Sequence, residues 1–174
     1  IIYGSVSGKK SDEDGNALGG ATLGIFKTGT AEFTKETAIA TTVSAEDGSF
    51  SFEKVPYGTW IVREIESPKG FVLSEEEIAV TVGKVDEVVE ISLVNYRIRG
   101  NIGLTKVDKD YPDNKLSGAE FEVYADTNGN GELDKDDELL GKMTEIEVGV
   151  YQMKELLYGK YFVKETKAPE GYVL

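Results

Sequence analysis

The chain has 174 residues, carries 19 basic against 32 acidic side chains, and contains neither histidine nor cysteine. A net charge of −13 repels nucleic acid and anionic lipid, so neither is expected as a partner. Without histidine and cysteine the chain lacks the usual general base, the thiol nucleophile and the main zinc ligands, which disfavours hydrolytic and redox enzymes. The sequence shows no export signal of its own and no long apolar stretch, so we expect no membrane insertion in this segment.

Short segments of alternating polarity predict an all-β chain. In the first half, apolar residues alternate along the segments that contain Val6, Phe52, Trp60 and Leu93. The turn signals DEDGN, EDGS, PYG and SPKG fall between such segments, at the spacing of a sandwich with short strands. The stretch from residue 27 to 42 fits either a short helix or a strand with a loop, and we treat it as a surface excursion.

The two halves of the chain repeat each other. GKKSDEDGNALGGATLGIF (8–26) aligns with LTKVDKDYPDNKLSGAEFEVY (104–124), and DGSFSFEKVPYGTWIVREIESPKGFVL (47–73) aligns with VGVYQMKELLYGKYFVKETKAPEGYVL (148–174). Matching Tyr-Gly pairs begin at Tyr57 and Tyr158, so the period is about 100 residues, the size of a small domain and longer than most solenoid repeats. We therefore expect two domains, over residues 1–98 and 99–174.

The second copy stops early by comparison with the first. The first copy continues beyond GFVL (70–73) with at least two further strands over residues 78–95, and the second copy shows no equivalent of them. Three explanations are open: the chain is cut short, the remainder is disordered, or another chain completes the sheet at an unpaired edge.

Polar side chains fall on apolar strand faces in both halves of the chain. Period-two geometry places Lys10 on the face of the first strand and Glu64 on the face of a later one, and Lys106 and Glu165 repeat this arrangement in the second half. Only the first half adds Asn95, on the apolar face of its last strand. Buried charges cost several kcal/mol unless they are paired or neutralised. One interpretation is therefore a buried Lys10–Glu64 ion pair capped by the Asn95 amide, and another is that the side chains face outward.

A third interpretation is a chemical reaction within the core. Burial lowers the pKa of a lysine and raises that of a carboxyl, which places a nucleophilic amine beside a proton donor. If Asn95 lies against both, the amine of Lys10 can attack its carboxamide while Glu64 hydrogen-bonds the carbonyl and moves protons, and ammonia leaves. The proximity of groups in a folded core supplies the effective molarity that so slow a reaction needs. Lys9 is the alternative nucleophile, because a bulge would exchange the facing of the two lysines.

These segments, and above all YFVKETKAPEGY (161–172), resemble the collagen-adhesin B-type (Cna B-type or SpaA-type) domains of Gram-positive pilins and adhesins. The last segment is similar to the E-box of that family, in which a glutamate precedes Thr-x-x-Pro-x-Gly-Tyr. The first copy departs from this motif, because EIESPKGF has Ile65 and Phe71 where the family has threonine and tyrosine. The resemblance implies an extracellular β-sandwich of reverse immunoglobulin or transthyretin-like topology with an internal Lys–Asn isopeptide bond.

Carried over by position, the resemblance makes Glu64 and Glu165 the E-box glutamates, Lys10 and Lys106 the lysines, and Asn95 the acceptor. Lys106 then has no acceptor within these residues and stays uncrosslinked. The implied function is a structural stalk module on a Gram-positive cell wall, with other domains of the same surface protein as partners. We keep two alternatives: an adhesin module that binds a host protein or glycan, and a carbohydrate-binding domain of a secreted enzyme. Enzyme activity on an external substrate is not expected, because the internal reaction consumes its own groups.

The acidic loop DTNGNGELDKDD (126–137) has the spacing of an EF-hand calcium loop. The candidate ligands are Asp126, Asn128, Asn130, the backbone carbonyl of Glu132, and Asp137, with a glycine at the sixth position. An aspartate replaces the usual bidentate glutamate at position twelve, and flanking helices are not predicted. The loop is therefore either a weak calcium site or a solvated hairpin, and no cofactor is required by the rest of the chain.

Overall fold

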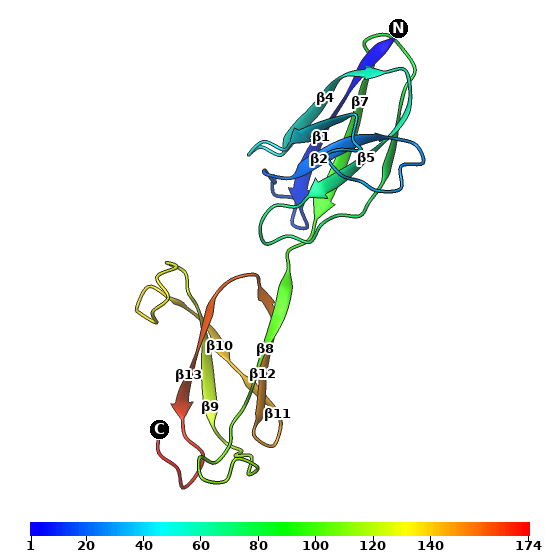
Figure 1. Ribbon diagram of the computed structural model, residues 1–174. Coiled ribbons are helices and arrows are strands. Elements are labelled where there is room, and N and C mark those ends of the chain that lie inside the picture. Colours follow the sequence, from blue (N-terminus) through cyan, green and yellow to red (C-terminus); the bar gives the residue numbers. More distant parts are fainter. The chain divides into compact units, whose positions relative to one another are not determined.

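A computed structural model describes all residues from 1 to 174, and the chain in it divides into two compact units (Figure 1). The first unit spans Ile1–Ile98 and the second Arg99–Leu174. All regular structure is β-strand, which confirms the all-β prediction. No helix forms, so the chain has no long apolar helix of the kind that crosses a membrane.

The first unit is a sandwich of two sheets. One sheet has the strand order β4-β1-β7 and the other the order β3-β2-β5-β6. The seven strands are β1 (Tyr3–Asp12), β2 (Thr22–Lys27), β3 (Ala40–Val43), β4 (Ser49–Pro56), β5 (Gly58–Glu66), β6 (Ile78–Val82) and β7 (Val88–Asn95). Their inward faces form one apolar core, built from residues that include Val6, Leu23, Phe52, Val62 and Leu93.

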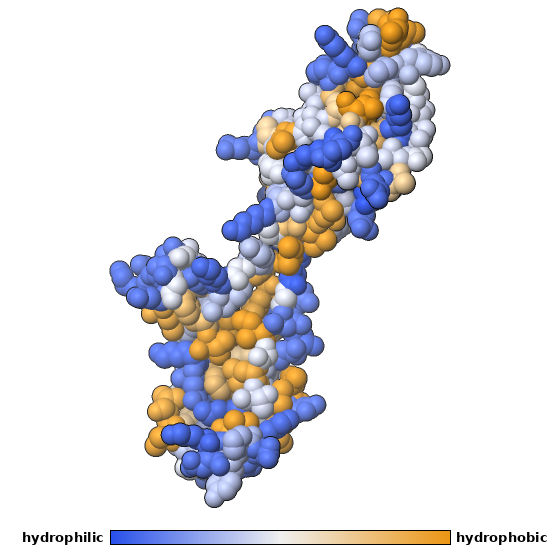
Figure 2. Space-filling model, viewed as in Figure 1, coloured by the Kyte–Doolittle hydropathy of each residue, from blue (hydrophilic) through white to orange (hydrophobic).

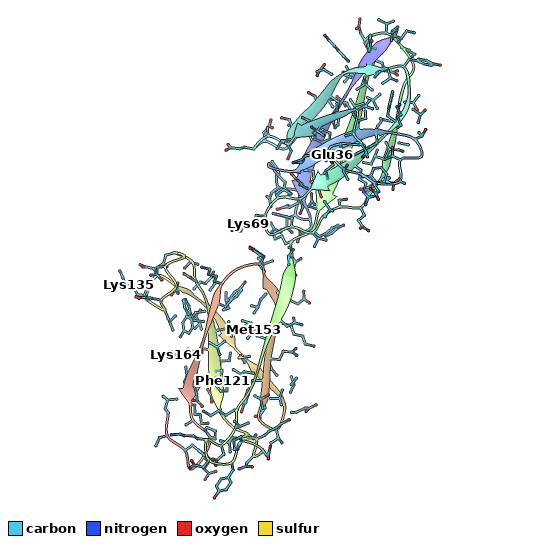
Figure 3. All side chains as sticks on the ribbon, viewed as in Figure 1. Glu36, Lys69, Phe121, Lys135, Met153 and Lys164 are labelled. Carbon is cyan, nitrogen blue, oxygen red and sulfur yellow. The ribbon has the colours of Figure 1, made fainter.

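The second unit repeats this plan with two three-stranded sheets, β11-β12-β8 and β10-β9-β13. Its strands are β8 (Arg99–Thr105), β9 (Glu120–Ala125), β10 (Glu138–Lys142), β11 (Thr144–Glu147), β12 (Val150–Leu157) and β13 (Tyr161–Lys167). Its core gathers around Phe121, Val123 and Tyr151, and the labelled side chains of Phe121 and Met153 show where β9 and β12 contribute to it (Figure 3).

The visible surface of the second unit carries many apolar residues. Figure 2 shows them gathered over the middle of that face, and large apolar side chains that are exposed in this unit include Leu139, Leu157 and Val163. The centre of its core is nevertheless fully buried at Val123, as the core of the first unit is at Val6, Leu23 and Val62.

The repeat extends to the detail of the backbone. Lys54 on β4 and Glu155 on β12 occupy matching positions, and both adopt the left-handed conformation, with φ of 54° and 60°. Each lies where the register of its strand shifts, which identifies a β-bulge that both copies share. Because non-glycine residues seldom adopt positive φ, this match supports a common origin for the two units independently of their side chains.

The ambiguous stretch after β2 forms neither a helix nor a continuous strand. Residues 28–39 are a series of turns, and β3 begins only at Ala40. Phe33 anchors this excursion, because its ring packs edge-on against Phe26 at 4.9 Å between centroids, and the Arg63 guanidinium lies 4.4 Å from the centroid of its ring. The excursion lies at the surface, and it is also tied to the sheet by an ion pair of 2.8 Å between Lys35 and Glu66 and by a backbone hydrogen bond of 2.8 Å from Ile39 to Ile25.

Candidate functional site

Three polar side chains meet in the core of the first unit, each from a different strand. Lys10 comes from β1, Glu64 from β5 and Asn95 from β7. The side chains of Lys10 and Glu64 are fully shielded from solvent, and Asn95 is 1% exposed. Residues two apart in a strand lie on the same face of the sheet, which explains why these side chains point inward. Each one follows by two positions a residue of the inward face, namely Gly8, Val62 and Leu93.

Strand pairing brings the first and last strands together. β1 and β7 run parallel, with Lys10 opposite Leu93 and Asp12 opposite Asn95. The lysine and the asparagine therefore lie near the same end of neighbouring strands and face the same way. Glu64 reaches them from β5 in the facing sheet. This topology assembles residues that are up to 85 positions apart in the sequence.

The contacts among the three groups are short but incomplete. Nζ of Lys10 lies 3.5 Å from Oε1 of Glu64, and Nδ2 of Asn95 donates a hydrogen bond of 2.7 Å to Oε2 of Glu64. Nζ of Lys10, Oε1 of Glu64 and Oδ1 of Asn95 make no hydrogen bond within the protein. Buried polar atoms are rarely left without partners, and a group that is left so requires an explanation, such as strain or a catalytic role.

Burial also changes the chemistry of the lysine. Desolvation lowers the pKa of Lys10 from its ordinary value of 10.5, and the neighbouring Glu64 only partly opposes that effect. A larger fraction of this amine is therefore neutral at moderate pH than for a lysine in water. A neutral amine with a free lone pair is a nucleophile, so the site combines a nucleophile, a carboxyl group that can carry protons, and a carboxamide.

Lys9 lies on the opposite face of β1. Its side chain is 64% exposed and forms an ion pair of 3.3 Å with Asp47. Hydrogen bonds from Ser49, followed by that from Lys9, lower the pKa of Asp47 to about 2. The strand has no bulge between the two lysines, since its register with β7 runs unbroken from Ser5 to Asp12. The structure thus places Lys10 at the core site and Lys9 in solvent.

The segment after Glu64 turns back onto the site. Phe71 donates a hydrogen bond of 3.1 Å to the carbonyl of Pro68, and Gly70 adopts φ of 88° at the third position of this turn, where a left-handed residue is required. The second unit has the same turn, closed by Tyr172 and Pro169 at 3.1 Å, with φ of 84° at Gly171. The proline and glycine of the repeated motif thus form the same turn in both units.

Beyond that turn, two backbone groups contact the site directly. The carbonyl of Val72 accepts a hydrogen bond of 2.7 Å from Nδ2 of Asn95, and the N–H of Ser74 donates one of 2.7 Å to Oε2 of Glu64. The sequence does not predict these contacts, because backbone groups carry no residue signature. The spacing of the turn after the glutamate is the only signal that could have indicated them.

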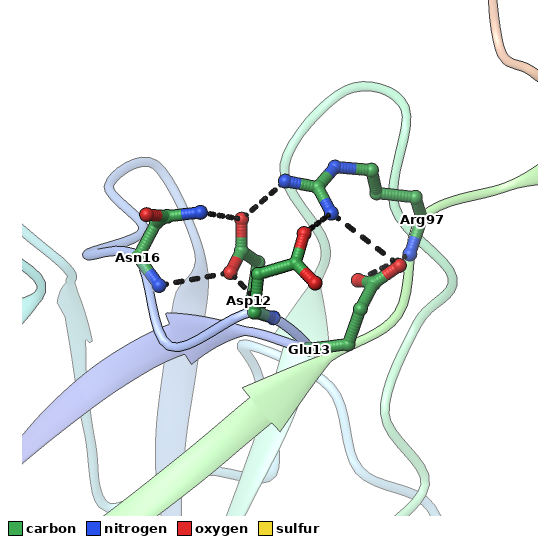
Figure 4. A network of polar contacts seen from close by, with 5 residues as sticks. Asp12, Glu13, Asn16 and Arg97 are labelled. Atoms are coloured by element: carbon green, nitrogen blue, oxygen red, sulfur yellow. Dashed lines mark hydrogen bonds and ion pairs between the residues drawn. The ribbon is translucent and has the colours of Figure 1, made fainter.

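Just beyond Asn95, Arg97 joins the end of β7 to the turn after β1. Its guanidinium contacts Asp12 at 2.5 Å, Asp14 at 2.6 Å and Glu13 at 3.5 Å, and its backbone N–H donates to Glu13 at 3.0 Å (Figure 4). A hydrogen bond to Asp14 and the charges of the surrounding carboxylates raise the pKa of Arg97 above its ordinary value. This cluster, which the sequence did not single out, holds the two parallel strands together next to the site.

In the second unit, Lys106 and Glu165 also meet, but in a more open setting. Nζ of Lys106 lies 2.9 Å from Oε1 and 3.0 Å from Oε2 of Glu165, and the two side chains are 26% and 21% exposed. The backbone repeats the first unit here, since Lys10 donates to Gly48 at 2.7 Å and Lys106 to Gly149 at 2.8 Å. No asparagine from another strand joins this pair, which is therefore a hydrogen-bonded ion pair.

The acidic loop is folded around its own backbone. Side-chain oxygens of Asp126, Asn128, Asn130 and Asp137 accept backbone N–H groups of the loop at 2.7–3.2 Å, while Glu132 supplies only a backbone donor to this network. Both asparagines donate their amides to Asp134, at 3.1 and 2.7 Å. Asp134 is the ninth residue of the loop, which is also a ligand position in an EF-hand, although it is not among the ligands expected from the sequence. The carboxylates do not converge into a preformed cluster, so calcium binding stays a prediction.

Comparisons with known proteins agree with this architecture. The family model described as SpaA, prealbumin-like fold domain, matches twice, over residues 4–97 and 100–174. Among solved structures, the Bacillus anthracis TIE protein is similar with a TM-score of 0.81 and 30% identity, over 99% of this chain and 30% of that one. A streptococcal ancillary pilin has a TM-score of 0.52 and 23% identity, over 100% of this chain and 56% of the pilin.

The chain thus spans less than two thirds of the length of either structure. A search of curated proteins found no match.

Proposed function

The chain belongs to the family of SpaA prealbumin-like fold domains, and from this premise we propose that it is a structural stalk module of a Gram-positive adhesin or pilin. In this proposal, an autocatalytic isopeptide bond between Lys10 and Asn95 stiffens the first unit. The observation that carries the proposal is the buried meeting of Lys10, Glu64 and Asn95, in which three polar atoms have no hydrogen-bond partner.

The reaction is an exchange of one amide for another. A proton passes from Nζ of Lys10 to Glu64, which leaves a neutral amine beside a neutral carboxylic acid. Nζ then forms a bond to Cγ of Asn95, and Glu64 carries a further proton from Nζ to Nδ2 as the Cγ–Nδ2 bond breaks. The departing ammonia takes the first proton with it as ammonium, which returns Glu64 to its carboxylate form, and the product is a Lys10–Asn95 amide. The lysine and the asparagine are consumed, so the chain turns over once and is not an enzyme.

The position of the bond explains its mechanical value. It would join β1 to β7, the first and last strands of the first unit, which lie side by side in the same sheet. Tension applied at the two ends of the unit would then pass through a covalent link and would not have to separate the strands. Because the chain has no cysteine, this bond would do the work that disulfides do in other secreted domains.

The setting of the module follows from its relatives. One similar structure is a streptococcal ancillary pilin, and pilins are surface proteins, which supports an extracellular location on a Gram-positive cell wall. Two similar units in tandem also suit a spacer that is built by repetition. The partners proposed for this segment are therefore other domains of the same surface protein.

Intact-mass spectrometry of the denatured chain tests the proposal. The mass of the chain after folding should be lower than the mass calculated from its sequence by one ammonia. A digest should contain the peptide of Lys10 joined to that of Asn95. Glu64→Gln preserves the size of the side chain but cannot carry the proton, and it should restore the full mass. A full mass for the folded unaltered chain would overturn the proposal and leave a buried ion pair.

A further inference from the structure

The carboxamide of Asn95 has a defined orientation in the core. A backbone carbonyl oxygen can only accept hydrogen bonds, so the carboxamide atom that contacts Val72 at 2.7 Å must be the NH2 group. The same nitrogen lies 2.7 Å from Oε2 of Glu64. The NH2 group, which is the group that leaves in an isopeptide reaction, therefore faces the carboxyl of Glu64. This differs from the expectation from the sequence that Glu64 hydrogen-bonds the carbonyl of Asn95, because that carbonyl oxygen has no partner.

The carboxyl of Glu64 is oriented as well. Its Oε2 accepts hydrogen bonds from both the backbone of Ser74 and the amide of Asn95, whereas Oε1 is the oxygen next to Nζ of Lys10. One oxygen thus serves the nucleophile and the other serves the leaving group. The carboxyl of Glu64 can therefore accept a proton from Lys10 at Oε1 and donate a proton to Nδ2 of Asn95 from Oε2.

We propose that the return segment, residues 70–74, is the positioning element of this reaction: it turns the NH2 group of Asn95 toward Glu64 and fixes which oxygen of Glu64 receives it. The inference rests on the proposed isopeptide chemistry and assigns the segment a role in it. Two hydrogen bonds fix the segment itself, from Val72 N–H to the carbonyl of Tyr96 and from Ile98 N–H to the carbonyl of Gly70, both 2.8 Å. The return segment is thus hydrogen-bonded to the two residues that flank Arg97.

Geometry of this kind controls rate more than stability. A displacement of about 1 Å in a reacting group can slow a reaction by about 100-fold, because proximity and alignment supply much of the rate. If the return segment is displaced, the carboxamide can rotate and present its carbonyl oxygen to Glu64. The fold then survives while crosslinking slows.

Two pairs of variants distinguish the effect of the backbone geometry of the return segment from the effect of replacing a side chain in it. Ser74→Pro removes the N–H that holds Glu64, and Ser74→Ala keeps it. Gly70→Val places a β-branched residue at φ of 88°, whereas Gly70→Asn supplies a residue that tolerates this conformation. The proline and valine variants should crosslink about 100-fold more slowly than the unaltered chain, and the alanine and asparagine variants within about tenfold of it.

The assay starts from chain isolated in denaturant, so that folding by dilution also starts the reaction. Fluorescence of Trp60, the only tryptophan, reports folding of the first unit, and intact mass reports crosslinking in the same sample. Slow loss of ammonia after normal folding supports the positioning role. Equal crosslinking rates in the members of each pair would overturn it.

A separate measurement does not depend on the reaction. Lys10→Met cannot crosslink, and in this variant the side-chain NH2 protons of Asn95 should exchange slowly with water and show nuclear Overhauser effects to the backbone of Leu73. Fast exchange without those effects would overturn the proposed orientation even if the unaltered chain crosslinks. If the orientation is observed and the unaltered chain keeps its full mass, the isopeptide proposal fails while the structural role of the segment remains.

Discussion

Asn95 Nδ2 lies 2.7 Å from Glu64 Oε2, a contact between the last strand of one sheet and the central region of the facing sheet. The two residues are buried to 1% exposure, and Lys10 completes the group from the strand beside Asn95. Every partner that the isopeptide reaction requires is therefore present in one desolvated place. The same arrangement explains why only the first unit is expected to react.

We predict that Lys10 alone supplies the nucleophile. Lys10→Ala should restore the full mass of the chain, because it removes the amine that is buried in the core with Glu64. Lys9→Ala should leave the loss of ammonia unchanged, since Lys9 is directed to solvent and paired with Asp47. Intact mass and peptide mapping of both variants measure this. A crosslink that persists in Lys10→Ala and disappears in Lys9→Ala would reverse the assignment.

The pH dependence of crosslinking should reflect the lowered pKa of Lys10. The reaction needs a neutral amine together with a protonated Glu64, so the reactive pair shares one proton, and the initial rate should fall when high pH removes that proton. Because desolvation lowers the pKa of Lys10 below its ordinary value of 10.5, the midpoint of this fall should lie below that value. Rates measured by intact mass after dilution from denaturant give the profile. A midpoint at or above 10.5 would show that the amine reacts from a solvated state.

Much of this site could be predicted from residue patterns, because alternation in a strand decides which side chains face the core. Lys10, Glu64 and Asn95 each stand where an apolar residue is expected, and polar residues in such positions have to find one another. The repeat added a second constraint, since Lys106 and Glu165 stand in equivalent positions. The all-β fold followed from the same alternation.

Other contacts depend on the course of the backbone and on tertiary packing, which residue patterns do not predict. The contacts of Val72 and Ser74 involve backbone atoms, whose positions follow from the turn at Gly70 and from pairing with the segment after β7. Arg97 was not singled out, because its three carboxylate partners lie more than 80 residues away in the sequence. The excursion before Ala40 stayed ambiguous, because its anchor, Phe33, acts through tertiary packing and not through periodicity.

Arg97 should stabilise the first unit by joining its first and last strands. Arg97→Ala removes the ionic contacts with Asp12, Glu13 and Asp14 and leaves clustered carboxylates that repel one another. The unfolding midpoint of the first unit should therefore fall, and fall less at high salt, which screens the repulsion. Trp60 fluorescence during thermal unfolding measures this in the Glu64→Gln background, where no crosslink masks the effect. Arg97→Lys keeps the charge and should lose less.

Lys106 should remain a free amine in the folded chain. Its ammonium pairs with Glu165 but is 26% exposed, whereas Lys10 is fully buried. An amine-specific acylating reagent should therefore modify Lys106 under native conditions, and modification of Lys10 should require unfolding. Peptide mass mapping after brief labelling compares the two sites, and Glu64→Gln is the control in which Lys10 is uncrosslinked but still buried. A Lys106 that resists labelling while exposed lysines react would contradict its assignment as an open ion pair.

Calcium should bind to the acidic loop of the second unit through its side-chain oxygens. The ligands expected are Asp126, Asn128, Asn130, Asp134 and Asp137, with the Glu132 carbonyl. Binding has to compete with hydrogen bonds that these oxygens already accept from the loop backbone, so we expect weak affinity and a site that rearranges around the ion. A ligand that binds only the folded state raises the unfolding midpoint.

Thermal unfolding in calcium, with magnesium as the control ion, should therefore show a rise for the second unit and none for the first. Asp126→Ala and Asp137→Ala should each remove the rise. Lys135→Ala, at an exposed position in the same loop (Figure 3), should preserve it, because that side chain donates no oxygen. An equal rise in magnesium, or none at millimolar calcium, would show that the loop is a hydrogen-bonded hairpin that needs no metal.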